Sequence, residues 1–249
     1  MPYSIGLAGK GGTGKTTIAA LLVKYLLQNN KVPILAVDAD SNANFNDVLG
    51  LEVQDTLGNA REEMKKGVAT GMTKDVFMEM KLEQAVVEAE GFDLIVMGRP
   101  EGAGCYCAAN TLLTTYLDKL IENYRYIVID NEAGMEHISR LTTNNIDVLL
   151  VISDPTRRGI QAAARIYGLT NELNLNIAKK YLIVNQAREG QGESIRRLVD
   201  QHDLVLTGMI PEDPKVNEFD LKGKPTITLD EESAALRAAF DIFKNVLQQ

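Results

Sequence analysis

Short apolar runs alternate with longer amphipathic segments along the whole chain. Most of the apolar runs are four to six residues long and nearly continuous, which is typical of parallel strands buried on both faces. The runs that we expect to form strands are residues 4–8, 33–37, 92–97, 126–129, 148–152, 180–184 and 205–209.

The amphipathic segments between these runs predict helices. They lie at residues 16–28, 73–89, 111–123, 159–173, 192–201 and 232–247. Repeated alternation of strand and helix is typical of an α/β, doubly wound fold, so we expect a mainly parallel sheet of seven or eight strands flanked by helices. No Pro/Gly/Ser-rich linker or internal repeat interrupts the pattern, and residues 1–249 are therefore predicted to form a single domain.

The charge balance narrows the classes of partner. The chain has 26 Lys and Arg against 34 Asp and Glu, a net charge of −8. A net anion is repelled by DNA and by anionic lipid, so we expect no nucleic-acid and no membrane partner, although a local basic patch is not excluded. No apolar run approaches the roughly 20 residues that span a bilayer, and no basic leader precedes the first strand. We expect a cytoplasmic protein.

A glycine-rich loop follows the first predicted strand. Residues 9–16 read Gly-Lys-Gly-Gly-Thr-Gly-Lys-Thr and match G-x-x-x-x-G-K-[ST], in the strand–loop–helix context that this phosphate-binding motif requires. Backbone N–H groups of such a loop, with the helix N-terminus behind them, surround phosphate oxygens. The candidate nucleotide-binding residues are Gly9, Gly11, Gly12, Thr13, Gly14, Lys15, Thr16 and Thr17.

Two side chains of this loop have specific predicted roles. Lys15 is expected to reach the β- and γ-phosphates of ATP, and the Thr16 hydroxyl to bind Mg²⁺. The alternative is a chance glycine-rich turn, which the order of strand, motif and helix disfavours. The motif therefore predicts an ATP-binding and ATP-hydrolysing protein.

A second lysine, Lys10, precedes Gly11-Gly12 in the loop. Its position resembles the deviant Walker A signature of the MinD/ParA/Mrp and nitrogenase-iron-protein superfamily. The resemblance implies that Lys10 reaches across a homodimer interface to the partner's nucleotide and is catalytic. A cation supplied by the second subunit stabilises transition-state charge only when two subunits close. The plainer alternative is a solvated surface lysine.

Acidic residues end two of the predicted strands. Asp38 and Asp40 follow the second strand, and the resemblance to the superfamily's first switch implies that Asp40 positions the attacking water, while Asp38 assists the metal shell. Asp130 ends an apolar strand in the pattern that holds hydrated Mg²⁺. The segment after it, Asn131-Glu132-Ala133-Gly134, resembles the second switch, in which Gly134 is free to swing toward a γ-phosphate. Lone acids at strand ends are usually solvated, so these roles depend on the phosphate loop.

Polar residues after two later strands are candidates for contact with the base. Asn185 follows the strand at 180–184, and Pro211 and Asp213 follow the strand at 205–209. Both places match where relatives hold adenine. We expect Asn185 to hydrogen-bond the ring and residues 211–213 to line its edge.

Cys105 and Cys107 are the only cysteines, and they lie in a glycine-rich segment after the third predicted strand. Neighbours this close would form a strained disulfide, so metal or redox chemistry is favoured. Two thiolates cannot complete a four-ligand site, but a two-fold axis through this loop would bring four together. The alternative reading is two small buried apolar side chains.

With the deviant loop, both switches and Gly-Cys-Tyr-Cys in this order, the whole chain resembles the CooC/AcsF family of nickel-insertion ATPases. The resemblance implies that Cys105 and Cys107 bind Ni²⁺ or Zn²⁺ at the dimer interface. It also implies that ATP binding and hydrolysis to ADP couple dimerisation to metal delivery. The client is then apo carbon monoxide dehydrogenase or apo acetyl-CoA synthase.

Two other functions remain open at this point. Four thiolates at a dimer axis also suit a [4Fe–4S] cluster, so an ATP-gated Fe–S carrier or electron-transfer protein is the main alternative. Against it, the segment 131–141 lacks the second cysteine of the iron-protein pattern. A spatial regulator of the MinD/ParA kind is the other alternative, but the chain shows no basic amphipathic C-terminal tail.

Overall fold

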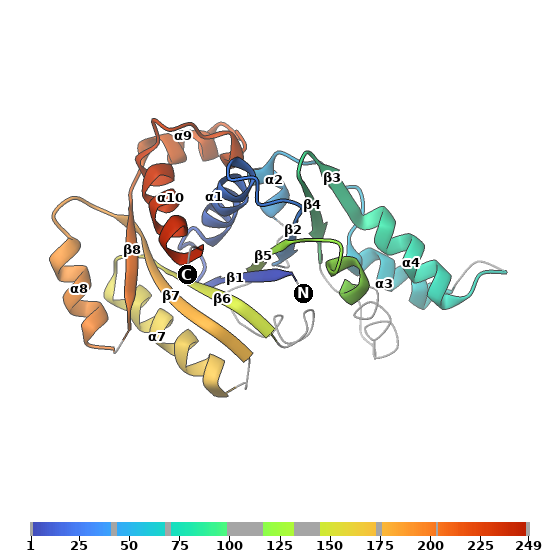
Figure 1. Cartoon of the computed structure of the whole chain (residues 1–249), viewed down its shortest axis with the longest axis horizontal. Helices are drawn as coiled ribbons and strands as arrows, with labels where there is room; N and C mark the ends of the chain where they lie inside the picture. Colours follow the sequence, from blue (N-terminus) through green and yellow to red (C-terminus); the bar gives the residue numbers. More distant parts are fainter. Residues whose placement is uncertain are drawn as a thin grey trace.

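The fold is built on one eight-stranded sheet (Figure 1). The computed structural model describes residues 2–40, 44–67, 71–98, 117–131, 145–172, 176–202 and 204–247. Its strands lie in the order β3-β4-β2-β5-β1-β6-β7-β8. They are β1 (Tyr3–Gly9), β2 (Ile34–Ala39), β3 (Val86–Ala89), β4 (Phe92–Val96), β5 (Tyr126–Asn131), β6 (Asn145–Ser153), β7 (Asn176–Ala187) and β8 (Leu206–Pro211). All neighbours are parallel except β3 and β4.

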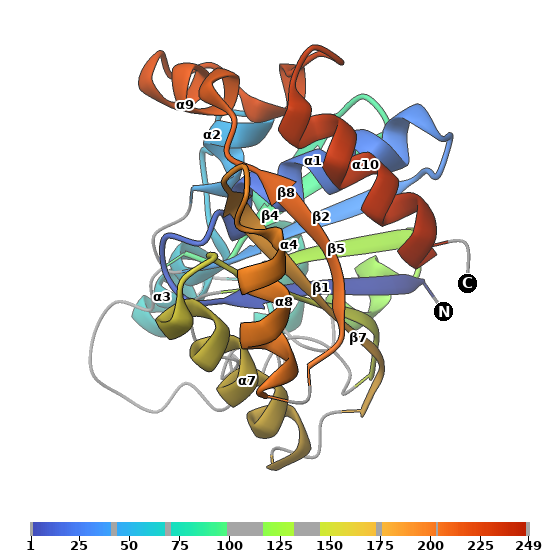
Figure 2. The ribbon, with the colours of Figure 1, turned by 90° about the vertical axis from the view of Figure 1, so that its left-hand side faces the viewer.

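Helices cover both faces of this sheet. They are α1 (Lys15–Gln28), α2 (Phe45–Leu49), α3 (Leu57–Lys66), α4 (Lys74–Ala85), α7 (Arg157–Glu172), α8 (Gly192–Asp200), α9 (Pro214–Leu221) and α10 (Ala234–Leu247), with a short 3₁₀ turn η2 (Thr226–Thr228). Figure 2 shows α1 and α10 on one face of the sheet and α7 and α8 on the other. The second face is covered by α3 and α4 further along.

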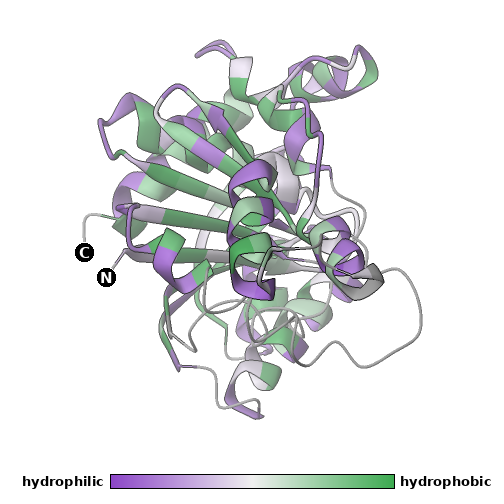
Figure 3. Ribbon diagram, turned by 90° about the vertical axis from the view of Figure 1, so that its right-hand side faces the viewer, coloured by the Kyte–Doolittle hydropathy of each residue, from purple (hydrophilic) through white to green (hydrophobic). Residues whose placement is uncertain are grey.

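Alternation of side chains along the strands explains these layers. In β1, Ile5 and Leu7 pack into the core with α1 and α10, whereas Ala8 packs on the opposite face with α7. Because successive side chains of a strand point to opposite faces, a strand covered on both sides must be apolar throughout. Figure 3 shows this as strands that are mostly hydrophobic, between helices whose polar and apolar residues alternate. The predicted doubly wound, mainly parallel sheet is confirmed.

One predicted helix is too long. The helix expected at residues 73–89 ends at Ala85, and Val86–Ala89 forms β3, which pairs antiparallel with β4. The reason is local: Gly91 has φ 82° and closes a tight turn, which lets the β-branched pair Val86-Val87 fold back on the sheet edge. The eighth strand therefore comes from a segment assigned to a helix.

Other differences concern short or polar elements. The sequence pattern did not predict α2, α3 or α9. Strand β7 is longer than the expected strand because it begins earlier, with the mixed polar and apolar residues 176–179, and extends to Ala187. Of the helix expected at 111–123, only the part from Leu117 lies among the described residues, and it is helical through residue 121. Within the described ranges, none of the helices combines the length and apolar character needed to cross a membrane.

Candidate nucleotide-binding site

The glycine-rich loop connects the carboxyl end of β1 to the start of α1, at the centre of the sheet. Gly9 lies against β6 so closely that a Cβ atom there would be 2.3 Å from the Ile152 carbonyl oxygen. Gly14 has φ 84°, and a Cβ atom on it would be 2.4 Å from Asn185 Nδ2. Both positions therefore need glycine, one for close packing and the other also for its left-handed backbone.

The loop separates its two lysines. The Thr13 side chain is fully buried, and its hydroxyl donates a 2.8 Å hydrogen bond to the Lys10 carbonyl oxygen, which closes the turn. Lys10 itself is exposed, and its ammonium has no ion pair with another described residue. Lys15, by contrast, is only 7% exposed at the start of α1. Of the two side chains, Lys15 is therefore buried within its own subunit, whereas Lys10 lies on the surface.

Thr16 and Asp130 meet beneath the loop. The Thr16 hydroxyl donates a 2.6 Å hydrogen bond to Asp130 Oδ2. Asp130 is 1% exposed, and its Oδ1 is buried without a hydrogen-bond partner. Burial raises the pKa of Asp130 to about 6, against the opposing effects of the Thr16 hydrogen bond and the Lys15 charge. An unpartnered carboxylate oxygen beside a threonine hydroxyl fits the hard-oxygen ligand set of hydrated Mg²⁺.

Asp38 lies beside Asp130 on the neighbouring strand, because the two residues are in register between β2 and β5. Its side chain is completely buried, and its two oxygens accept hydrogen bonds from Asp40 N at 3.0 Å and Phe45 N at 2.9 Å. Burial raises the pKa of Asp38 to about 7, although these two hydrogen bonds lower it. Asp38 thus ties together the two ends of the segment between Asp40 and α2.

Asn131 is the first residue of the predicted second-switch segment 131–134, but the sequence assigned no role to its side chain. It is fully buried, its Nδ2 donates to the Leu7 carbonyl oxygen at 2.9 Å, and its Oδ1 has no hydrogen-bond partner. An unpartnered buried amide oxygen is costly, and such groups gather where structure changes or ligands bind. The signal available in the sequence was a polar residue directly after the acid that ends a buried strand.

A cavity of about 310 Å³ opens beside the loop, between the start of α1, the ends of β7 and β8, and α9. Its lining residues are Gly14, Thr17, Ile18, Leu21, Asn185, Gln186, Ile210, Pro211, Glu212, Asp213, Val216, Asn217, Asp220 and Ala235. Five of the predicted nucleotide-binding residues therefore line one cavity: Gly14, Thr17, Asn185, Pro211 and Asp213. Its size and mixed lining suit a small planar ligand group.

Asn185 and Asp213 hold the walls of this cavity together. Asn185 Nδ2 donates a 2.8 Å hydrogen bond to the Thr13 carbonyl oxygen, which fixes the end of β7 to the loop. Asp213 accepts from Lys215 N at 2.8 Å, from the Ser233 hydroxyl at 2.7 Å and from Ala235 N at 3.0 Å. Burial raises the pKa of Asp213, but these hydrogen bonds outweigh it and lower the pKa. Its carboxylate therefore holds the N-termini of α9 and α10 together at the edge of the cavity.

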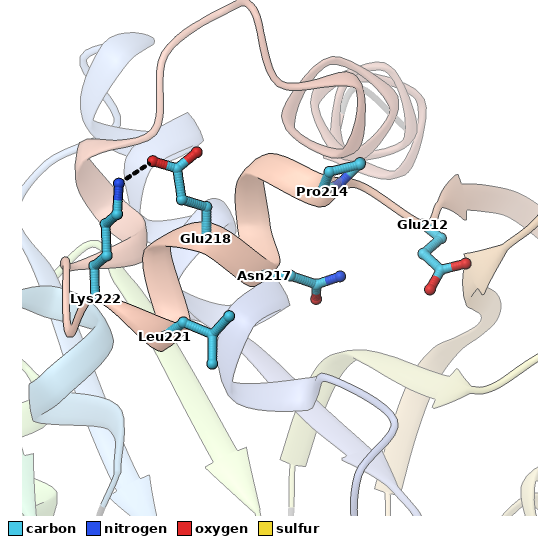
Figure 4. Close-up of a pocket in the computed structure, with 6 residues that line it drawn as sticks. All are labelled: Glu212, Pro214, Asn217, Glu218, Leu221 and Lys222. Carbon is cyan, nitrogen blue, oxygen red and sulfur yellow. Dashed lines mark hydrogen bonds and ion pairs between the residues drawn. The ribbon is translucent and has the colours of Figure 1, made fainter.

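Helix α9 separates the cavity from an outer hollow of about 410 Å³, whose lining residues Figure 4 labels. Glu212 and Asn217 line both spaces. Figure 4 also shows Leu221 on the outer side, where it is 88% exposed, and the 2.6 Å ion pair between Glu218 and Lys222. The α9 residues Val216, Asn217 and Asp220 of the cavity were not predicted, because no motif marks this helix.

Three predicted site residues lie outside the described residues: Cys105, Cys107 and Gly134. Over the parts of the chain that the structure describes, no cluster of three or more His, Cys, Asp or Glu side chains is arranged to hold a metal ion. The predicted Ni²⁺ or Zn²⁺ site therefore rests on the sequence alone.

Comparison with known proteins identifies the family. Residues 5–227 match the family model described as the CobQ/CobB/MinD/ParA nucleotide binding domain. The chain belongs to this family. As a CobQ/CobB/MinD/ParA-family protein, it is an ATP-binding P-loop NTPase, and the match covers the phosphate loop, both aspartate-bearing strand ends and the cavity wall.

Individual relatives within the family differ in what is known of them. An uncharacterised ATP-binding protein of Methanocaldococcus jannaschii is 40% identical over 98% of both chains. The carbon monoxide dehydrogenase accessory protein CooC of Rhodospirillum rubrum is 31% identical, over 88% of this chain and 87% of its own length. The structure of MinD from Pyrococcus horikoshii, complexed with Mg-ADP, superposes with a TM-score of 0.70 at 23% identity, over 99% and 96% of the two chains. This last similarity shows the fold.

Proposed function

We propose that residues 1–249 form one P-loop ATPase domain that hydrolyses ATP as a nucleotide-bridged homodimer and carries Ni²⁺ or Zn²⁺ on Cys105 and Cys107 to apo carbon monoxide dehydrogenase or apo acetyl-CoA synthase. The observation that carries the proposal is the similarity to CooC, an accessory protein of carbon monoxide dehydrogenase, together with a Cys-x-Cys in this chain. The relative bound to Mg-ADP supports the same nucleotide and cation here.

In this proposal the triphosphate lies along residues 9–17, with Lys15 on the β- and γ-phosphates. Thr16 and Asp130 would hold Mg²⁺, whose charge offsets that of the phosphates. Asp130 is suited to this because one of its oxygens is buried and unpartnered. Asp38 supports the arrangement from the neighbouring strand, and Gly134 follows as the second switch.

Catalysis divides between Asp40 and Lys10. Asp40 orients the attacking water, and its backbone N–H is fixed by the 3.0 Å hydrogen bond to Asp38. Lys10 is supplied to the nucleotide of the second subunit, where it stabilises charge on the transferred phosphoryl group. The exposure of Lys10 supports this role, because an ammonium that served its own subunit would be covered as Lys15 is.

The base occupies the cavity beside the loop, with adenine between Asn185, Pro211 and the wall of α9. Asp213 contributes by accepting hydrogen bonds from the N-termini of α9 and α10, which keeps α9 in position as one wall of the cavity. The apolar side chains Ile18 and Val216 supply the faces on which a planar base packs.

The metal is the cargo. Each subunit supplies two thiolates, and a two-fold axis through the two loops gives the four that a tetrahedral or square-planar site needs. Lys10 and the cysteines both need the second subunit. Closure of the ATP-bound dimer and capture of the metal therefore occur together, and ATP hydrolysis opens the nucleotide site and the metal site when the two subunits separate.

The proposal is tested by metal binding to a Cys105→Ala/Cys107→Ala variant, prepared anaerobically with a non-hydrolysable ATP analogue. We expect wild type to hold one Ni²⁺ or Zn²⁺ per dimer and the variant to hold none, with nucleotide affinity unchanged within about twofold. A Lys10→Ala variant is the matched control: it keeps the thiols and loses metal only through loss of the dimer. Stoichiometric metal on the cysteine variant, or a brown iron–sulfur chromophore on wild type, would contradict the proposal.

A further inference from the structure

Positive charge is concentrated in one part of this acidic chain. Residues 157–197 contain eight Lys and Arg but three Asp and Glu, whereas the whole chain carries a net charge of −8. This segment spans α7, β7 and α8, and the two helices lie side by side on one face of the sheet (Figure 2). This segment is therefore basic, although the chain as a whole is acidic.

The outer side of α7 carries part of the exposed positive charge of this region. Arg158, Arg165 and Leu169 are spaced by seven and four residues, which places them in one row along the helix. Both arginines are exposed, and Leu169 is 40% exposed. The opposite side of α7, with Ile160 and Ile166, is buried against the sheet.

These arginines are not used inside the described fold. Arg188 pairs with Glu212 at 2.7 Å, and Arg197 pairs with Glu193 on its own helix. Arg157, Arg158, Arg165 and Arg196 form no ion pair or hydrogen bond with another described side chain. Four guanidinium groups are therefore available to a partner, as far as the described residues go.

Helix stability does not explain them. Arg157 and Arg158 occupy the first turn of α7, which contains no acidic residue. The N-terminus of a helix carries partial positive charge, so arginine there is unfavourable and aspartate or glutamate is preferred. The two arginines therefore do not serve the stability of their own helix.

We propose that the exposed side of α7 with Arg196 of α8 is a docking surface for a partner protein that presents an acidic patch. Charge complementarity selects such a partner, and arginine is the cation most enriched in protein interfaces. Leu169 within the row supplies apolar contact that a phosphate backbone does not use.

The docking surface begins next to the nucleotide site. Helix α7 follows β6, whose Ile152 carbonyl oxygen packs against Gly9 of the phosphate loop. Arg188, at the other end of the region, pairs with Glu212 of the base cavity. The proposal depends on the surface alone and holds whether or not the cysteines carry a metal.

The test uses the full chain and fluorescein-labelled poly-L-glutamate as a defined acidic polypeptide, followed by fluorescence anisotropy in 50 mM salt. An Arg158→Glu/Arg165→Glu/Arg196→Glu variant is expected to bind roughly tenfold more weakly than wild type, since each exposed pair contributes modestly. A Lys74→Glu/Lys224→Glu/Lys244→Glu variant changes the net charge equally at exposed sites elsewhere and should bind within about twofold of wild type.

Several results would overturn the proposal. They are no binding by wild type, equal loss in both triple variants, or tighter wild-type binding to duplex DNA or to phosphatidylglycerol vesicles at the same salt. Circular dichroism checks that each variant is folded, and an Arg158→Gln/Arg165→Gln/Arg196→Gln variant repeats the test without charge reversal. Loss of poly-L-glutamate binding in both arginine variants, with the lysine variant unaffected, supports the surface.

Discussion

At the scale of single residues, two buried carboxylates set the character of the site. Asp38 and Asp130 lie side by side on the neighbouring strands β2 and β5, and each has a raised pKa because burial disfavours its charged form. Carboxylates held in this way bind a cation well, because the cation relieves the cost of their charge. When no cation is bound, these buried carboxylates lower the stability of the folded protein.

The raised pKa values predict how stability depends on pH. Asp38 titrates near 7 in the folded chain but near its ordinary value of 3.8 when unfolded. Between these values the folded state binds more protons, so the free energy of unfolding falls as pH rises from about 4 to 7. The slope from one such group is at most about 1.4 kcal/mol per pH unit.

Urea unfolding between pH 4 and 8 in EDTA measures this effect. An Asp38→Asn variant should lose much of the slope, whereas Glu218→Gln at an exposed position should keep it. A wild-type stability that rises over this range would show that the buried carboxylates do not control it.

The two lysines of the loop should separate binding from turnover. We expect Lys15→Ala to lose nucleotide binding and Lys10→Ala to bind ATP within a few-fold of wild type. Because Lys10 reaches the partner's nucleotide only in the closed dimer, its loss should lower kcat on the order of a hundredfold. Steady-state ATPase assays measure kcat, and a fluorescent ATP analogue measures nucleotide affinity. An unchanged kcat in Lys10→Ala would mean that Lys10 is only a solvated surface lysine.

At the scale of elements, α9 decides the shape of the base cavity. Its inner side contributes Val216 and Asp220 to the cavity, while Leu221 lies on the outer hollow. Asp213 joins its N-terminus to that of α10 through three hydrogen bonds. Residues far apart in the sequence thus act as one wall.

This arrangement predicts different effects on the two sides of α9. Val216→Ala removes a packing surface for the base and should weaken ATP binding about fivefold, near 1 kcal/mol. The matched variant Leu221→Ala truncates an exposed side chain and should leave ATP affinity unchanged. Isothermal titration with ATP and Mg²⁺ compares them, and equal effects would mean that the base lies elsewhere.

Asp213→Ala tests the link between the helices. Removing the carboxylate leaves the N-termini of α9 and α10 uncapped, and we expect the free energy of unfolding to fall by about 2 kcal/mol. Chemical denaturation measures the change. Asp200→Ala, at an exposed position on α8, is the comparison, and a similar small loss in both variants would argue against the capping role.

Much of the fold was predictable because short continuous apolar runs that alternate with amphipathic segments are typical of buried strands in an α/β sheet. The phosphate loop was predictable because its glycines are required by backbone geometry, as at Gly14. Strand β3 was missed because its four residues continue an amphipathic segment, and only the turn at Gly91 separates them. The wall residues of α9 depend on tertiary contacts that no local pattern encodes, and the burial of the Asn131 amide likewise depends on its contact with Leu7 of β1.

At the scale of the whole molecule, the account depends on two subunits that complete each other. Lys10 is an exposed residue of the phosphate loop, and the two cysteines of one subunit supply half of a metal site with four ligands. Family membership and the fold establish an ATP-binding P-loop protein, and the similarity to CooC supports metal delivery as its purpose.

The most direct test is the mass of the anaerobic protein in solution, measured by light scattering with ADP and with a non-hydrolysable ATP analogue, each with and without Ni²⁺. We predict a dimer near twice 27.3 kDa with the ATP analogue and metal, and a shift toward the 27.3 kDa monomer with ADP alone. A monomer that binds its metal tightly under every nucleotide condition would contradict the account.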